Sequence, residues 1–182
     1  MPTITPTGQV CGAVVTNVDL SQPLDQATTS ALRAALDQHR VLVLPRQSLS
    51  NADLERFSTC FGDLGTDPWF VPIEGSDHIA EVRRDADETT PVFADAWHSD
   101  WSFLEVPPIA TCLYGIEIPP VGGDTLFADQ HLAYQRLPDD LRARVDGLTA
   151  THSTRAIYGT GGIYDADNET EQGRSMQIVQ GP

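Results

Sequence analysis

The spacing of apolar side chains predicts two helices in the first third of the chain. Residues 24–39 place apolar side chains at intervals of three and four positions, which is typical of an amphipathic helix. Asp25 or a nearby threonine suits the N-cap of this helix. A second helix is expected after Ser50, with Asp53 near its positive N-terminal end. Its core face follows the positions i, i+3 and i+7, occupied by Leu54, Phe57 and Phe61.

Short runs rich in β-branched residues predict the strands. Two strands are expected within residues 3–20, and a fully buried strand at Val41 to Leu44. The long apolar run from Ile109 to Ile118 is expected at the centre of the sheet. Further strands are predicted at residues 78–83, 124–128 and 148–153, helices at 130–136 and 137–147, and loops at 85–96 and 156–182.

Charge excludes several classes of partner and of chemistry. The net charge of -15 repels phosphate backbones and anionic lipids, so we expect neither a nucleic acid nor a membrane partner. Every one of the 11 basic residues is arginine. The chain therefore cannot use a P-loop lysine, a pyridoxal phosphate Schiff base or a lysine nucleophile. An anionic cosubstrate must be held by arginine, histidine, hydroxyl groups or backbone N–H groups.

The cysteines and the length indicate one domain in a reducing compartment. Cys11, Cys60 and Cys112 are widely spaced and odd in number, which favours reduced thiols in the cytoplasm over a disulfide or zinc framework. The 182 residues suffice for a single domain with its own core. The sequence leaves open whether the chain forms a homo-oligomer.

The chemistry concentrates in residues 97–103, WHSDWSF. His98 and Asp100 stand two positions apart, so in an extended backbone their side chains project to the same side. Such a pair, together with a distant second histidine, is the facial triad of non-haem Fe(II) oxygenases. Without that context, a histidine beside a surface aspartate is the favoured explanation of the pair.

The flanking motifs supply the context. Residues 107–110 read PPIA, residues 119–127 read PPVGGDTLF, and residues 12–20 read GAVVTNVDL. In order and spacing, these segments resemble the TauD/TfdA family of Fe(II)- and 2-oxoglutarate-dependent dioxygenases. The resemblance runs from near the N-terminus to about Ser153.

The resemblance implies a fold, a reaction and a set of ligands. The implied fold is mainly β with flanking helices, a double-stranded β-helix of the jelly-roll type. The implied reaction hydroxylates a small organic substrate with O2 and 2-oxoglutarate, and releases succinate and CO2. By this resemblance His98 and Asp100 bind Fe(II), and the hydroxyl of Thr125 contacts a carboxylate of 2-oxoglutarate. Composition alone would make Thr125 only a β-former on a strand.

The expected substrate contacts differ from those of taurine-type members. Those members hold a sulfonate with a histidine and a tyrosine, where this chain has Asp67 and Phe70. A carboxylate repels a sulfonate, so a small sulfonate is not the expected substrate; Asp67 also fits a simple turn before Pro68. Trp101 and Phe103 match positions that line the substrate pocket, provided that the segment leaves regular strand geometry; otherwise both are core residues.

The resemblance stops short of two groups that the family reaction needs. No residue matches the second metal histidine or the arginine that pairs with the far carboxylate of 2-oxoglutarate. We therefore expect residues 1–182 to be a single dioxygenase domain that lacks its C-terminal part, although a natural short form is the alternative. A different class of function also remains, a truncated, non-catalytic binding module on the same scaffold.

Overall fold

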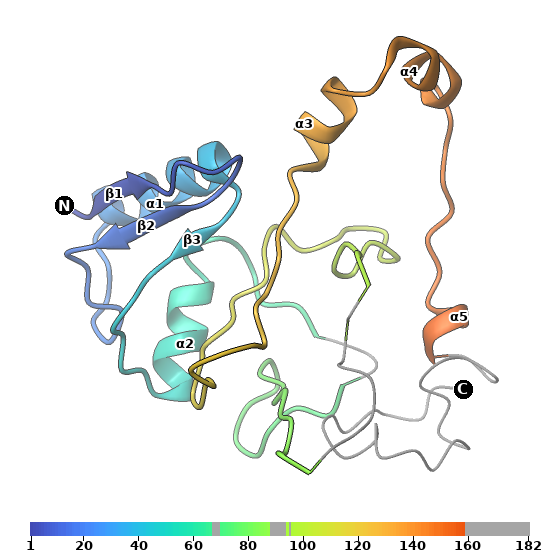
Figure 1. Ribbon diagram of the computed structural model, residues 1–182. Helices are drawn as coiled ribbons and strands as arrows, with labels where there is room; N and C mark the ends of the chain where they lie inside the picture. The colour runs from blue at the N-terminus through green and yellow to red at the C-terminus, as the bar shows by residue number, and fades with distance from the viewer. Residues whose placement is uncertain (67–69, 88–93, 95, 159–182) are drawn as a thin grey trace. The chain divides into compact units, whose positions relative to one another are not determined.

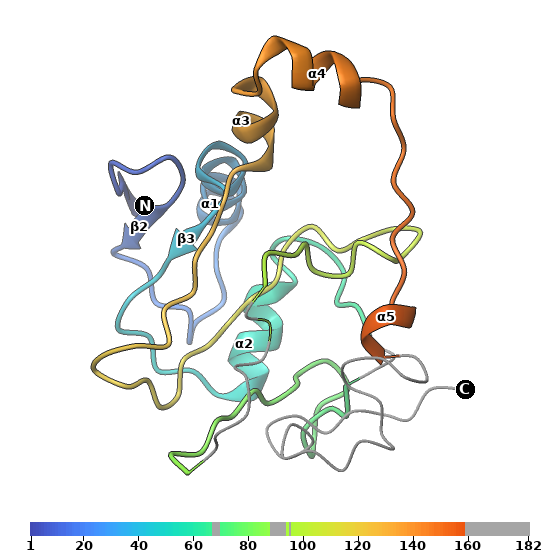
Figure 2. The same cartoon turned by 45° about the vertical axis from the view of Figure 1, so that its right-hand side comes forward.

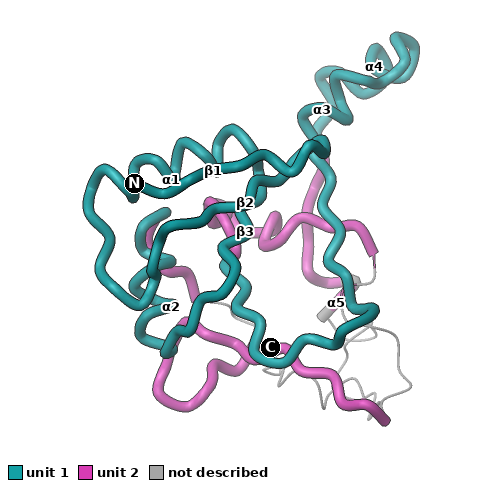
Figure 3. Tube along the Cα trace, turned by 60° about the vertical axis from the view of Figure 1, so that its left-hand side comes forward, with its two compact units in different colours: residues 1–61, 112–149 teal, residues 62–111, 150–182 magenta. Residues whose placement is uncertain are grey.

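The computed structural model describes residues 1–66, 70–87, 94 and 96–158, apart from the side chains of 156 and 158. The chain divides into two compact units, coloured separately in Figure 3. Unit 1 comprises residues 1–61 and 112–149, and unit 2 comprises residues 62–111 and 150–182. The two segments of each unit are far apart in sequence, so the chain passes from one unit to the other and back.

Unit 1 begins with a small sheet. Strands β1 (Thr3–Pro6) and β2 (Ala13–Thr16) pair antiparallel, with Ile4 opposite Val15, and this confirms the two strands expected near the N-terminus. The turn between them passes through Gly12, whose φ of 106° is strained for any residue with a side chain. Strand β3 (Leu42–Val43) joins β2 in parallel and completes the order β1-β2-β3.

Two helices pack with this sheet, and both lie where the spacing of apolar residues predicts them (Figures 1 and 2). Helix α1 (Gln26–His39) begins at Asp25, whose carboxylate accepts the Thr28 N–H at 2.7 Å. Helix α2 (Asn51–Ser58) begins at Ser50, which forms a reciprocal capping box with Asp53. Their apolar faces meet the sheet in one core, whose buried members are Val15, Leu20, Leu32 and Phe57.

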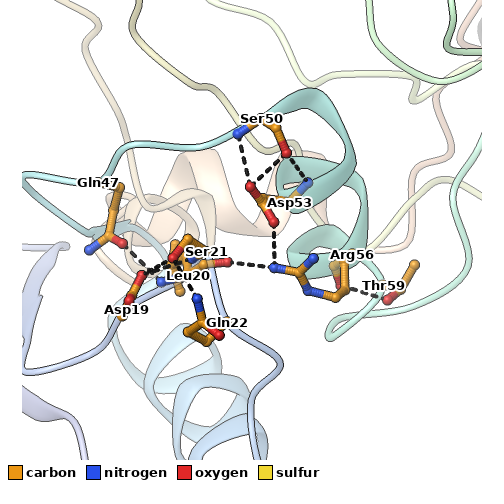
Figure 4. Close-up of polar contacts among 9 residues, drawn as sticks. All are labelled: Asp19, Leu20, Ser21, Gln22, Gln47, Ser50, Asp53, Arg56 and Thr59. Carbon is orange, nitrogen blue, oxygen red and sulfur yellow. Dashed lines mark hydrogen bonds and ion pairs between the residues drawn. The ribbon is translucent and has the colours of Figure 1, made fainter.

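A polar cluster joins the loop after β2 to Gln47 and to Arg56 of α2, as Figure 4 shows. The Gln47 amide accepts the backbone N–H of Leu20 at 3.0 Å and donates to the carbonyl oxygen of Val18 at 3.1 Å. The Arg56 guanidinium donates to the carbonyl oxygen of Leu20 at 3.1 Å and pairs with Asp53 at 2.7 Å. These contacts satisfy backbone groups that the short strands leave unpaired.

The later helices also agree with the sequence pattern. Helices α3 (Gln130–Gln135) and α4 (Asp139–Val145) lie in unit 1 where the two helical stretches are predicted, and neither contains a buried residue. Helix α5 (Arg155–Tyr158) lies where the predicted loop 156–182 begins, and residues 159–182 are outside the described part. Of the helices described, none has both the length and the apolar character needed to cross a bilayer.

The strand predictions beyond residue 44 were wrong for the residues described. Residues 78–83, 109–118, 124–128 and 148–153 form no strand, and the described sheet has three strands. In the predicted central strand, Ile116 is 87% exposed and Ile118 is 72% exposed. An apolar run forms a strand only where a neighbouring strand takes up its backbone N–H and C=O groups, and none of the described strands pairs with it.

The expected fully buried strand at Val41 to Leu44 also needs correction. Only Leu42 and Val43 are in strand geometry, and Val43 is 48% exposed. Strand β3 pairs with β2 on one side, which leaves it at the edge of the described sheet. Residues at an edge pack on fewer neighbours, so a uniformly apolar run does not guarantee burial there.

Candidate metal centre

The motif at residues 97–103 adopts a turn in unit 2. Trp101 has a φ of 49°, in the left-handed region, and its carbonyl oxygen accepts the Leu104 N–H at 3.0 Å. None of residues 97–103 is in a strand, and the backbone turns at residues 100–103. The predicted pocket role of Trp101 and Phe103 requires this geometry, because the side chains of a regular strand alternate strictly between its two faces.

The structure brings the side chains of His98 and Asp100 together. Nε2 of His98 lies 3.0 Å from Oδ1 of Asp100, and the two side chains are 52% and 48% exposed. The other ring nitrogen, Nδ1, lies 2.8 Å from the carbonyl oxygen of Ala96. The imidazole is thus held from behind by the backbone while its outer nitrogen faces the carboxylate. Their assignment as metal ligands stays a prediction.

The hydrogen bonding of this pair suits a cation. A carbonyl oxygen is an acceptor, so Nδ1 of His98 carries the ring hydrogen, and Nε2 of the neutral imidazole is then an acceptor too. Nε2 and Oδ1 of Asp100 are two acceptors at 3.0 Å, which repel each other unless a proton or a metal ion lies between them. Adjacent donors on an octahedral ion with bonds of about 2.1 Å are about 3.0 Å apart. The 3.0 Å separation therefore agrees with a shared metal ion and equally with a shared proton, and imidazole and carboxylate are both ligand types that iron accepts.

The second carboxylate oxygen of Asp100 accepts a hydrogen bond from a residue that the sequence did not single out. The hydroxyl of Thr111 donates to Oδ2 of Asp100 at 2.7 Å, across 11 positions of the chain. Thr111 follows the PPIA motif, and a single threonine there carries no recognisable pattern. A second contact of this kind joins Nδ1 of His152 to the hydroxyl of Ser102 at 2.8 Å, across 50 positions.

The candidate substrate contacts are only partly described. Trp101, Phe103 and Phe70 are half-buried in unit 2, whereas Asp67 lies outside the described residues. The indole of Trp101 covers Gly65 so closely that a Cβ built there would stand 2.7 Å from Cζ3. Trp101 thus packs against Gly65, which is the kind of contact expected if Trp101 is a core residue.

Thr125, the candidate contact of 2-oxoglutarate, belongs to unit 1. It is exposed and lies outside the helices and strands, so the alternative of a β-former on a strand is wrong for this residue. Its hydroxyl is available as a hydrogen-bond donor. Its role toward 2-oxoglutarate stays a prediction.

Among the residues that the structure describes, no group of three or more histidine, cysteine, aspartate or glutamate side chains is arranged to hold a metal ion. Three other histidines have partners of their own. Nδ1 of His78 lies 3.0 Å from the carbonyl oxygen of Gly65, Nε2 of His131 lies 2.8 Å from the Gln135 amide, and His152 contacts Ser102.

Comparison with known proteins decides the family. A family model described as taurine catabolism dioxygenase TauD, TfdA family matches residues 3–180. The chain belongs to the TauD/TfdA family. It is 34% identical over 150 residues to an alpha-ketoglutarate-dependent sulfate ester dioxygenase of Pseudomonas putida, an alignment that covers 82% of this chain and 48% of that protein.

Two further TauD/TfdA relatives show the same relationship. A (S)-phenoxypropionate/alpha-ketoglutarate-dioxygenase of Delftia acidovorans is 37% identical over 164 residues, which cover 82% of this chain and 54% of that protein. The crystal structure of a taurine dioxygenase from Burkholderia xenovorans superposes with a TM-score of 0.65 at 32% identity, over 80% of this chain and 52% of that one. The chain spans about half the length of the curated relatives that it matches.

Proposed function

We propose that this chain carries the His-x-Asp half of the iron site of a 2-oxoglutarate-dependent dioxygenase. The observation that carries the proposal is the 3.0 Å approach of Nε2 of His98 to Oδ1 of Asp100. The Ala96 carbonyl oxygen behind the imidazole leaves Nε2 as a lone-pair donor. The family of the chain supports the same reading, because its relatives are named as alpha-ketoglutarate-dependent dioxygenases.

The residues of the chain would bind and orient, while the bound groups supply the reaction. Fe(II) with 2-oxoglutarate and O2 supplies an oxidation that converts 2-oxoglutarate to succinate and CO2 and places a hydroxyl group on a substrate carbon. His98 and Asp100 would hold the iron, and the Thr125 hydroxyl would donate a hydrogen bond to a carboxylate of 2-oxoglutarate. We further propose that residues 1–182 belong to a single dioxygenase domain with the jelly-roll fold, a double-stranded β-helix.

The substrate class is proposed from the aromatic side chains of unit 2 and from the names of the relatives. Three aromatic side chains of unit 2, Phe70, Trp101 and Phe103, favour a small organic molecule with an apolar portion. The relatives act, by their names, on sulfate esters and on a phenoxypropionate, which combine an apolar body with an anionic group. Alkyl sulfates and aryloxypropionates are therefore the first substrates to test, beside uncharged analogues of the same size, because the expected repulsion by Asp67 disfavours an anionic group. Three free cysteines agree with the proposed cytoplasmic location.

The test measures succinate from 2-oxoglutarate with Fe(II), O2 and each candidate substrate. In a protein that carries residues 1–182 together with the second metal histidine and the arginine of the family, we expect succinate to form in a substrate-dependent manner, and we expect the His98→Ala variant to form none, because it loses the only imidazole of the pair. The exposed Gln26→Ala variant is the matched control and should equal the wild type. Succinate formation that is unchanged in His98→Ala would refute the assignment.

A second candidate function is a binding module that keeps the scaffold without turnover. The described residues favour it in one respect, because they supply two metal donors where the family reaction needs three. The two functions differ in a simple measurement. A module would bind a candidate substrate in equilibrium dialysis and form no succinate with any metal or substrate. A dioxygenase would bind the substrate and also form succinate.

A further inference from the structure

The two carboxylate oxygens of Asp100 have different surroundings. Oδ1 faces Nε2 of His98 at 3.0 Å, and Oδ2 accepts the Thr111 hydroxyl at 2.7 Å. The carboxylate is therefore divided between one oxygen directed at the imidazole and one oxygen held by a donor. A hydrogen bond of this length to an ionised group is in the range of the stronger, charge-assisted bonds.

An exposed aspartate needs such a contact to keep one orientation. The side chain of Asp100 is 48% exposed, so packing restrains it little. Rotation about the bond that carries an aspartate carboxyl group is broad and roughly two-fold, which lets the two oxygens exchange places. Thr111 is β-branched and stiff about its first side-chain torsion, and it stands three residues after Pro108 in a backbone restricted by two prolines.

We propose that Thr111 is a positioning residue for the metal site: its hydroxyl fixes the Asp100 carboxylate so that Oδ1 faces the position shared with His98. This inference rests on the proposed function, because it assumes that the pair binds a metal ion. Partners that orient a metal ligand from behind typically contribute roughly 10- to 100-fold in metal affinity. The two ligands would then be restrained in the same way, His98 by the Ala96 carbonyl oxygen and Asp100 by Thr111.

The experiment is a Mn(II) titration of the 182-residue chain, followed by the electron paramagnetic resonance signal of free Mn(II). Mn(II) is a spectroscopic substitute for Fe(II) that does not need O2 to be excluded. The chain has a net charge of -15 and will hold Mn(II) weakly elsewhere, so the binding that His98→Ala removes defines the site. Far-UV circular dichroism of each variant establishes that it is folded.

Four variants separate a positioning role from general damage. Thr111→Val keeps the shape and loses the donor, and we expect it to weaken His98-dependent Mn(II) binding roughly 10- to 100-fold. Thr111→Ser keeps the donor and should stay within about threefold of the wild type, since only the stiffness is lost. Thr149→Val makes the same change at an exposed threonine of unit 1 and should bind like the wild type. His98→Ala supplies the baseline.

Each outcome has one meaning. Loss in Thr111→Val with rescue in Thr111→Ser supports the proposal. Equal binding by Thr111→Val and the wild type, both above the His98→Ala baseline, overturns the role of Thr111 and leaves the metal site standing. If the wild type binds no better than His98→Ala, the proposed function of the pair fails, and the role of Thr111 fails with it.

Discussion

Replacing Gln47 tests how the core of unit 1 is held together. The side-chain amide makes three hydrogen bonds to backbone groups: it accepts from the Leu20 N–H at 3.0 Å, and donates to the carbonyl oxygens of Val18 at 3.1 Å and Pro45 at 3.3 Å. Gln47→Leu keeps most of the volume and removes all three bonds. A neutral hydrogen bond contributes about 0.5–1.5 kcal/mol net, and Leu20 is only 3% exposed, so little water can replace its lost partner. We expect a loss of about 2–4 kcal/mol in the free energy of unfolding.

The assay is urea denaturation followed by far-UV circular dichroism. The signal is chosen because α1 and α2 both lie in unit 1, whereas Trp97 and Trp101 lie in unit 2 and would report on that unit instead. Gln22→Leu is the matched control: its amide contacts the neighbouring Ser21 hydroxyl at 3.2 Å at the surface, and the change should stay within about 0.5 kcal/mol. Equal stability of Gln47→Leu and Gln22→Leu would refute the reasoning.

Two further predictions concern a helix cap and a close approach. Hydrogen bonds from the hydroxyl and the backbone N–H of Ser50, and then the contact with Arg56, lower the pKa of Asp53 to about 2 from 3.8. The stabilisation from this depressed pKa is present above about pH 4 and is lost as the pH falls toward 2, so Asp53→Asn should flatten the acid limb of an unfolding titration followed by circular dichroism; an unchanged limb would contradict it. At Gly65, an added Cβ would stand 2.7 Å from the Trp101 ring, and at Gly62 it would stand an ordinary 3.5 Å from Ile109. Gly65→Ala should cost about 1–3 kcal/mol in urea denaturation followed by tryptophan fluorescence and Gly62→Ala less than about 1, and equal effects would argue against the close packing.

The helices could be predicted because their signals are local. The spacing of apolar residues in 24–39 and the caps at Asp25 and Ser50 act within one or two turns of the chain, and the structure has α1 and α2 where these signals place them. The strands near the N-terminus were also predictable, since a glycine-containing turn joins two segments that pair with each other.

The later strands could not be predicted by the same reasoning. An apolar run such as 109–118 states that the segment prefers burial, but whether it becomes a strand depends on partners elsewhere in the sequence. The described strands offer none to it, and Leu113 is 72% exposed. Segment 78–83 shows the opposite problem, because the hydroxyl of Ser76 accepts the N–H groups of His78 and Ile79 in a turn that competes with the strand.

At the candidate site, the sequence identified the pair and missed the residue behind it. His98 and Asp100 stand two positions apart in a motif that points to them directly. Thr111 reaches Asp100 across 11 positions, and Ser102 meets His152 across 50. Such contacts depend on how the chain turns at Trp101, whose φ is 49°. A sequence pattern does not predict this left-handed conformation for a residue other than glycine.

The measurement that tests the central claim most directly is an anaerobic titration of the chain with Fe(II) and 2-oxoglutarate, followed by visible absorption. When 2-oxoglutarate chelates protein-bound Fe(II), a metal-to-ligand charge-transfer band forms. We predict a band in the wild-type chain that needs both Fe(II) and 2-oxoglutarate, and that is absent in His98→Ala, because the imidazole is one of the two proposed iron ligands. A wild-type chain without the band, or a His98→Ala variant that retains it, would contradict the assignment of His98 and Asp100 as the iron ligands.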